Sequence, residues 1–140
     1  MSFVNPEPEQ ICALLRGVKT IAVLGYSPKP DRPSHNVARR MQQFGFRIIP
    51  VRTGIDEGLG EKAYCDLASV PERIDLVNVF RTSEYLPEIV DECLRLGLKN
   101  LWIQEGIRDE EAATRARASG GMTVVMDRCI MRDYSRLCLG

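Results

Sequence analysis

A short loop between Gly25 and Ser34 carries residue types that bind phosphate. The loop contains Ser27, Lys29 and Arg32, and it follows an apolar run that ends at Gly25. Backbone N–H groups at the start of a helix attract anions, and lysine and arginine side chains bind phosphate oxygens through charge-assisted hydrogen bonds. The sequence therefore predicts a phosphate-binding loop between a strand and a helix, with Ser34 as the N-cap of that helix.

The glycine pattern of this loop differs from the dinucleotide-binding fingerprint. The pattern G-x-G-x-x-G would require glycines where the chain has Ser27 and Pro30. An NAD-binding unit also usually carries Asp or Glu about 20 residues further on, to bind the ribose 2′-hydroxyl. Here that stretch reads Pro50-Val51-Arg52-Thr53. An arginine in place of a carboxylate disfavours NAD and favours a phosphorylated ribose, which both NADP and coenzyme A (CoA) carry.

Four cations follow three of the predicted strands: Lys29 and Arg32, Arg52, and Arg81. Because the carboxyl ends of parallel strands meet at one edge of a sheet, we expect these side chains to converge there. Any one of them alone is commonly just a solvated loop residue. Together, in a chain whose formal net charge is zero, they fit a multiply phosphorylated ligand.

The elements that position this loop alternate along the chain. Strands are predicted at 20–25, 47–51, 75–80, 100–104 and 122–126, with helices between them, a loop at 52–60 and a last short helix at 130–137. Strands that are apolar on both sides and separated by helices predict a parallel sheet covered on both faces. We therefore expect an α/β fold, a Rossmann-like three-layer sandwich with a five-stranded parallel sheet, formed by residues 1–140 as a single domain.

Charge and hydropathy limit the classes of partner. The 19 basic and 19 acidic residues cancel, so no global field attracts nucleic acid or an anionic membrane. Apolar runs are too short to span a bilayer, and the N-terminus lacks a cationic segment followed by an apolar one. We expect a cytoplasmic location, a small-molecule ligand, no nucleic-acid or membrane partner, and a monomer or small homo-oligomer.

The five cysteines and the single histidine do not form a metal-binding pattern. Cys12 and Cys93 fall on apolar helix faces and are predicted to be small core side chains, whereas Cys129 and Cys138 near the C-terminus are left open. His35 is expected to be a neutral ring that packs or bonds to a loop group. One histidine gives no Ser-His-Asp or Cys-His set, so no catalytic residues are predicted. We also expect Arg128 to pair locally with a neighbouring aspartate.

Five motifs together resemble a known family. They are G-Y-S-P-K-P-D-R-P-S-H-N-V-A at 25–38, I-I-P-V at 48–51, V-N-V-F-R at 77–81, L-W-I-Q-E-G-I at 101–107 and V-V-M-D-R-C at 124–129. In this order they resemble the small stand-alone CoA-binding proteins, which are similar to the N-terminal CoA-binding domain of the succinyl-CoA synthetase alpha subunit. The resemblance implies bound CoA. The synthetase also uses a second domain with a phosphorylated histidine and a nucleotide-grasp subunit, and these 140 residues contain no counterpart of either.

The resemblance implies which residues bind CoA. The first loop would hold phosphates, the ends of the second and third strands would flank the adenine and ribose, and the turn after the fourth strand would face the pantetheine. These residues are Gly25, Tyr26, Ser27, Pro28, Lys29, Arg32, Ser34, Val51, Arg52, Phe80, Arg81, Ile103, Gln104, Glu105 and Gly106. Arg52 and Tyr26 depart from the family pattern, and Tyr26 is expected to narrow the pocket or to stack on a ligand.

The sequence thus favours a module that binds CoA or an acyl-CoA through its 3′-phospho-ADP moiety, without a complete catalytic apparatus. An NADP-linked oxidoreductase explains Arg52 equally well, and a regulatory or scaffold subunit with a vestigial cleft is a third reading. A buried structural thiol is the favoured role of Cys129, and a mixed disulfide with the CoA thiol is the alternative. The sequence does not specify an acyl group or a pathway.

Overall fold

The structure is a computed structural model that describes residues 3–139. Its helices and strands are α1 (Pro8–Arg16), β1 (Thr20–Leu24), α2 (Pro33–Gln43), β2 (Arg47–Val51), β3 (Glu57–Gly58), β4 (Glu61–Lys62), β5 (Leu76–Val79), α3 (Leu86–Arg95), β6 (Asn100–Gln104), α4 (Glu110–Gly120), β7 (Thr123–Arg128) and α5 (Ile130–Asp133). Short 3₁₀ turns span Leu67–Ser69 and Ser83–Tyr85, and a π-helical turn, Tyr134–Cys138, continues α5.

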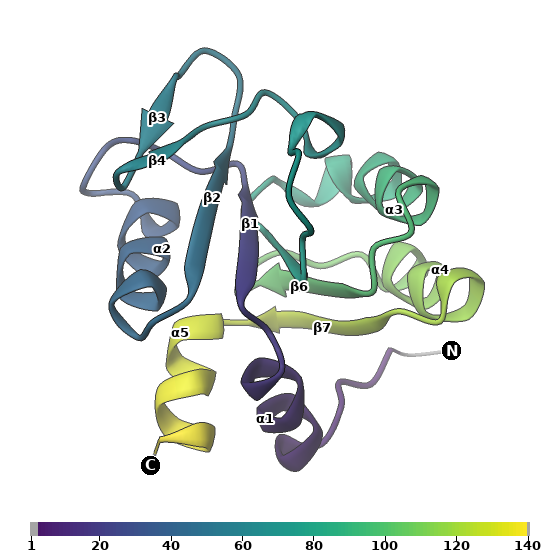
Figure 1. The fold of residues 1–140 in the computed structure, drawn as a ribbon. Coiled ribbons are helices and arrows are strands. Elements are labelled where there is room, and N and C mark those ends of the chain that lie inside the picture. The colour runs from purple at the N-terminus through teal and green to yellow at the C-terminus, as the bar shows by residue number, and fades with distance from the viewer. Residues whose placement is uncertain (1–2, 140) are drawn as a thin grey trace.

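Five strands form one parallel sheet in the order β2-β1-β5-β6-β7. The order reverses direction between β1 and β5, because the chain first moves outward to β2 and then returns past β1 to β5. Helices lie on both sides of this sheet (Figure 1). The structure confirms the Rossmann-like α/β architecture with a five-stranded parallel sheet. It also locates the topological switch point, where such sheets bind ligands beyond the strand ends.

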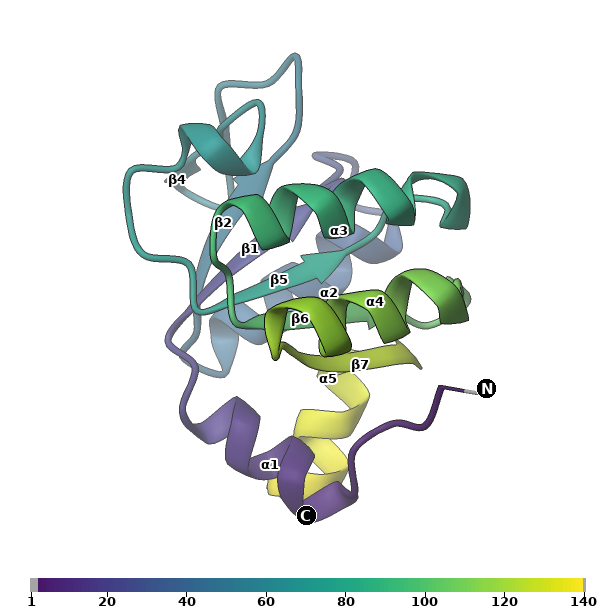
Figure 2. The same cartoon turned by 90° about the vertical axis from the view of Figure 1, so that its right-hand side faces the viewer.

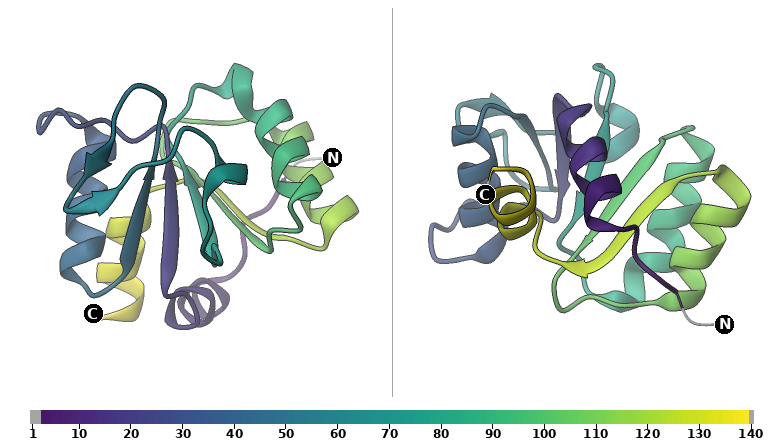
Figure 3. Two further views of the ribbon diagram at one scale, coloured as in Figure 1. Left: turned by 45° about the horizontal axis from the view of Figure 1, so that its top comes forward. Right: turned by 90° about the horizontal axis from the view of Figure 1, so that it is seen from below.

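The two faces of the sheet bury separate apolar clusters. Helices α3 and α4 cover one face (Figure 2), where Leu86 and Val90 pack with strand residues such as Val77. The other face packs against α1, α2 and α5 (Figure 3), where Met41 and Trp102 are fully buried. Because successive strand residues point to opposite faces, strands covered on both sides must be apolar throughout. This requirement explains the continuous apolar runs of the sequence.

The segment 52–60, predicted as a loop, contains the first strand of a small hairpin. Strand β3 pairs with β4 in antiparallel register, and Leu59 at the turn has a positive φ of 53°. The hairpin lies beside α2 and the end of β2 (Figures 1 and 3). Strands of two residues are too short to show an alternating pattern, so no periodic signal in the sequence indicates them.

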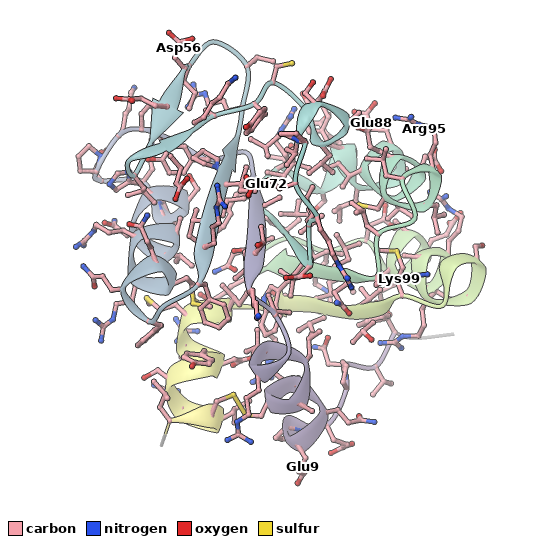
Figure 4. The ribbon with its side chains drawn as sticks, viewed as in Figure 1. Glu9, Asp56, Glu72, Glu88, Arg95 and Lys99 are labelled. Atoms are coloured by element: carbon pink, nitrogen blue, oxygen red, sulfur yellow. A yellow bond between two sulfur atoms is a disulfide. The ribbon has the colours of Figure 1, made fainter. Side chains whose placement is uncertain are left out.

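The C-terminal segment is tied to the first helix by a disulfide between Cys12 and Cys138 (Figure 4). Cys12 is buried, as predicted for a small core side chain, but the sequence analysis did not anticipate its disulfide. The two cysteines are 126 residues apart, and only the packing of α1 against the C-terminal turn brings them together. Cys93 is a free, fully buried thiol on α3, as predicted.

Helices across residues 3–139 are all too short or too polar to cross a membrane.

Candidate ligand-binding cleft

A cleft of about 640 Å³ opens beyond the carboxyl ends of the central strands. Its walls come from the loop after β1, the first turn of α2, the ends of β2 and β5, the turn after β6, and the segment that follows β7. Gly25 and Phe80 directly follow β1 and β5, so the cleft lies at the switch point of the sheet.

Gly25 lets the chain turn sharply out of the sheet. Its φ is +89°, and a Cβ atom there would lie 3.0 Å from the Arg81 side chain and 3.2 Å from the backbone of Phe80. Gly25 N also donates to Val51 O at 3.0 Å. A larger residue would therefore be strained in its own backbone and crowded by the end of β5. The glycine that ends this apolar run therefore has a steric cause.

Two serine hydroxyls hold the loop in shape. Ser27 N donates to Ser34 Oγ at 2.9 Å, and Lys29 N donates to Ser27 Oγ at 3.2 Å. Helix α2 begins at Pro33 with Arg32 as its N-cap, and no side chain caps it. The prediction that Ser34 caps the helix was therefore wrong, because its hydroxyl fastens the loop instead. Ser34 N has no acceptor among residues 3–139, which leaves a backbone donor at the start of α2.

Tyr26 turns away from the cleft. Its side chain is 1% exposed, and its hydroxyl lies 3.1 Å from His35 Nδ1. The ring packs so tightly under the β3–β4 hairpin that a Cβ on Gly58 would come within 2.6 Å of it. Burial raises the pKa of the Tyr26 phenol. The side chain thus supports the loop from beneath, where it neither narrows the cleft nor reaches a ligand. His35 bonds to a loop group, as predicted.

Three of the four predicted cations line the cleft: Lys29, Arg32 and Arg52. No carboxylate in the described part of the chain lies within ion-pair distance of any of them. The Arg52 guanidinium makes a single long hydrogen bond within residues 3–139, from Nη1 to Tyr26 O at 3.5 Å. The cleft therefore presents positive charge that the protein itself does not neutralise.

The fourth cation, Arg81, lies next to the cleft. It borders an adjoining hollow of about 290 Å³ together with Val51, and this hollow shares Gly25 and Arg52 with the cleft. The Arg81 guanidinium stacks 4.1 Å from the centre of the Tyr85 ring. The four cations thus line two adjoining hollows that share Gly25. The sequence predicted a single cluster of cations.

The turn after β6 is shaped by a bulge in the neighbouring strand. The register between β6 and β7 shifts after Ile103, so that Gln104 pairs with Arg128 and Asp127 is left out. Asp127 has a positive φ of 60°, and its carboxylate accepts from Gly106 N at 2.7 Å and from Arg108 Nη1 at 3.1 Å. The Gly106 bond, followed by Arg108, lowers the pKa of Asp127. Bulges of this kind commonly aim side chains at functional sites.

Of the four residues predicted at this turn, two reach the cleft. Gln104 and Glu105 line it, whereas Ile103 is fully buried in the core and Gly106 lies outside the lining. Pro28 in the first loop is exposed and also lies outside the lining.

The segment after β7 forms a wall that the sequence analysis largely missed. Cys129, Met131 and Arg132 line the cleft from this side. Arg132 Nη1 donates to Glu105 Oε1 at 2.5 Å, and this bond lowers the pKa of Glu105. Pro33, Val37 and Ile107 complete the missed lining. A positional signal existed for Cys129 and Ile107, which closely follow β7 and β6, because residues after a parallel strand lie at the ligand-binding edge.

The predicted local pairing of Arg128 anchors this wall. Arg128 Nε and Nη2 donate to the two carboxylate oxygens of Asp133 at 2.5 and 2.9 Å. Trp102 Nε1 donates to Arg128 O at 2.8 Å. Because Trp102 and Asp133 are buried, the start of α5 is fixed against the core.

A family model, a curated protein and a solved structure each match nearly the whole chain. The model of a family described as CoA binding domain matches residues 19–135. The chain is 45% identical over 126 residues to the uncharacterized protein YneT of Bacillus subtilis, covering 90% of this chain and 93% of that protein. A solved structure of a hypothetical protein from Pyrococcus horikoshii superposes with a TM-score of 0.89 at 32% identity, covering 100% of both chains.

A longer relative is similar in only part of its length. The alpha subunit of the ADP-forming acetate–CoA ligase II of Pyrococcus furiosus is 26% identical over 129 residues. The match covers 84% of this chain but 28% of that subunit.

Proposed function

The chain belongs to the CoA binding domain family, and from this premise we propose that its cleft binds CoA or an acyl-CoA through the 3′-phospho-ADP moiety. Membership of the family supports CoA binding in general. The assignment of the nucleotide end to particular residues rests on charge and geometry.

The unpaired cations carry this proposal. Lys29, Arg32 and Arg52 line one cleft without a carboxylate partner among residues 3–139. CoA carries a pyrophosphate and a 3′-phosphate, and charged hydrogen bonds to phosphate are among the strongest that side chains form. The free Ser34 N–H at the start of α2 adds a backbone donor of the kind that binds phosphate at helix N-termini. We assign the pyrophosphate to the first loop and the phosphorylated ribose to the side of Arg52 and Arg81.

The remaining walls suit the pantetheine arm, which is long, largely apolar and interrupted by two amides. Ile107 and Met131 offer apolar surface, and Gln104 offers a polar group in the same lining. We therefore assign the arm to the side of the cleft formed by the β6 turn and the segment after β7.

We further propose that the cleft binds without a complete catalytic apparatus of its own. His35 is hydrogen-bonded to Tyr26 beneath the loop, and Glu105 is paired with Arg132. His35 also lies outside the cleft lining, and the Arg132 hydrogen bond lowers the pKa of Glu105, which makes its carboxylate a weaker base.

Calorimetric titration with three ligands tests the assignment. CoA is expected to bind, and dephospho-CoA, which lacks the 3′-phosphate, is expected to bind about tenfold more weakly because it loses a charged contact. The absence of heat and of a thermal shift at millimolar CoA would contradict the proposal. NADP is the third ligand, because Arg52 would equally suit its 2′-phosphate. Displacement of CoA by NADP at similar concentration would favour the oxidoreductase reading instead.

A further inference from the structure

We propose that Cys129 is a modification site whose thiol forms a mixed disulfide with the thiol end of CoA held in the cleft. This inference rests on the proposed function, because it requires the pantetheine arm to lie along the wall after β7. Cys129 is a free cysteine that lines the cleft and is 5% exposed. The Arg128–Asp133 pair and the Trp102–Arg128 hydrogen bond fix the backbone on both sides of it.

The hydrogen bonding of the Gln104 side chain independently supports a binding position for an amide-bearing ligand beside this thiol. Its Oε1 accepts from Asn78 Nδ2 at 3.2 Å and from Ile130 N at 3.4 Å. Because both partners are donors, the oxygen must face them and the amide nitrogen must face elsewhere. Ile130 directly follows Cys129, so this bond places the Gln104 amide next to the backbone of the cysteine.

The Gln104 nitrogen has no partner in the protein. Nε2 has no hydrogen-bond acceptor within residues 3–139, although the residue is only 5% exposed. All fully enclosed side-chain nitrogen and oxygen atoms in the described chain do have partners, so Nε2 keeps some open surface. Gln104 lines the cleft, and we therefore take that surface to face the cleft. The protein supplies no acceptor for this donor, and a pantetheine carbonyl in the cleft would supply one.

A cation also lines this wall. Arg132 follows Cys129 by three residues, lines the cleft and donates to Glu105 Oε1 at 2.5 Å. The thiolate of Cys129 is the species that would attack a disulfide.

The reaction is a thiol–disulfide exchange with CoA disulfide as the oxidant. Cys129 loses its proton to solvent, and its thiolate attacks one sulfur of CoA–S–S–CoA. The S–S bond of CoA disulfide breaks as the Cys129–S–S–CoA bond forms. The second CoA leaves as a thiolate and takes up a proton. The Cys129 sulfur is oxidised, and one CoA sulfur is reduced.

The other cysteines provide matched controls within the same chain. Cys93 is fully buried in α3, and burial raises the pKa of its thiol to about 12. Cys65 is exposed and borders the adjoining hollow. Cys12 and Cys138 are already joined. Simple thiol exposure therefore predicts reaction at Cys65, whereas the proposed exchange predicts reaction at Cys129.

The experiment exposes the full chain, without reductant, to CoA disulfide or to glutathione disulfide at equal concentration. Intact mass measures the rate, and peptide mapping of the unaltered protein locates the adduct even if a variant fails to fold. We expect one CoA adduct, on Cys129, formed at least about tenfold faster than the glutathione adduct because the nucleotide positions the disulfide. C129S is expected to abolish this adduct, whereas C65S is expected to leave its rate unchanged.

Calorimetry with reduced CoA separates failure of this inference from failure of the proposed function. Binding of CoA without an adduct, or with an adduct only on Cys65, would overturn the inference and leave the function standing. Equal rates with the two disulfides would show a merely accessible thiol and would also overturn it. No binding of CoA together with no adduct would overturn both.

Discussion

Strand β2 has an arginine at each end, and one of them is paired with carboxylates whereas the other is not. Arg47 begins the strand and is paired with Glu61, at 3.5 Å, and with Glu72. Arg52 follows the other end and has no carboxylate partner in the part of the chain that the structure describes. An arginine on this strand is therefore neutralised at the amino end and left available at the carboxyl end. The formal net charge of zero does not reveal that paired and unpaired arginines lie at different ends of the strand.

Two hollows of similar size extend the comparison. The hollow at the amino ends of the strands has a volume of about 530 Å³, close to that of the cleft. Its lining includes Glu72 and Lys99, both labelled in Figure 4. There Asp75 accepts from Lys19 N and Thr20 N, at 3.0 Å each, and pairs with Arg73. Volume does not distinguish the two hollows, but their acidic residues do, because Glu72 and Asp75 line the amino-end hollow and each pairs with an arginine.

The largest expected effect comes from removing two unpaired cations together. K29A/R32A should weaken CoA binding by roughly 1.5–3 kcal/mol for each charged hydrogen bond lost from a desolvated contact. The melting temperature should barely change, because exposed loop cations contribute little to folding. Calorimetry and thermal unfolding measure the two quantities. Arg39 on α2, exposed and outside the cleft, provides the control variant R39A. A collapse in melting temperature would show that the loop cations are structural.

Replacing the arginine at each end of β2 by alanine tests the comparison directly. R52A should weaken CoA binding about tenfold, near the lower limit for a charged hydrogen bond. R47A should leave affinity unchanged and lower the free energy of unfolding by about 0–1 kcal/mol, as for exposed ion pairs. Both variants are measured by titration with CoA and by denaturant unfolding. Equal loss of affinity in the two variants would remove the distinction between the strand ends.

A smaller effect of opposite sign is expected from Glu105. E105Q removes a negative charge from the cleft and releases Arg132, which is bonded to Glu105 at 2.5 Å. Binding of an anionic ligand should therefore tighten a few-fold, and more at low ionic strength than at high. Titrations at two salt concentrations measure the change. Weaker binding would instead show that the Glu105–Arg132 pair shapes the cleft.

The smallest expected effect is the pH dependence of the β6 turn. The pKa of Asp127 is lowered, first by the Gly106 hydrogen bond. Its contribution to stability is therefore complete above the unfolded pKa of about 3.9 and is lost as pH falls through the lower, folded value. D127N keeps a residue that tolerates positive φ but removes the titration. Melting temperatures between about pH 2 and 6 should fall more steeply with acid for the unaltered chain than for D127N. Parallel curves would exclude this role.

Local patterns predicted most of the architecture. The strand at 20–25 agrees with β1 within one residue, and the strands at 47–51 and 100–104 match β2 and β6, because buried parallel strands leave long apolar runs. The loop after β1 was also recognisable, since Gly25 and the nearby cations are local in sequence.

Features that depend on distant contacts were not predictable in this way. Ser34 looks like a helix cap in sequence, and only the folded loop shows that Ser27 N claims its hydroxyl. The sequence predicted Tyr26 as a cleft residue, and only the folded structure shows that its ring packs under the β3–β4 hairpin. The part of the wall formed by Met131 and Arg132 depends on where the chain runs after β7, which no local pattern specifies.

The Cys12–Cys138 bond makes nearly the whole polypeptide a closed covalent ring, which contains every strand of the sheet. A single peptide cut anywhere inside this ring opens it but releases no fragment. Nicked molecules therefore keep the mass of the intact chain, apart from one added water, until the sulfur bridge is reduced.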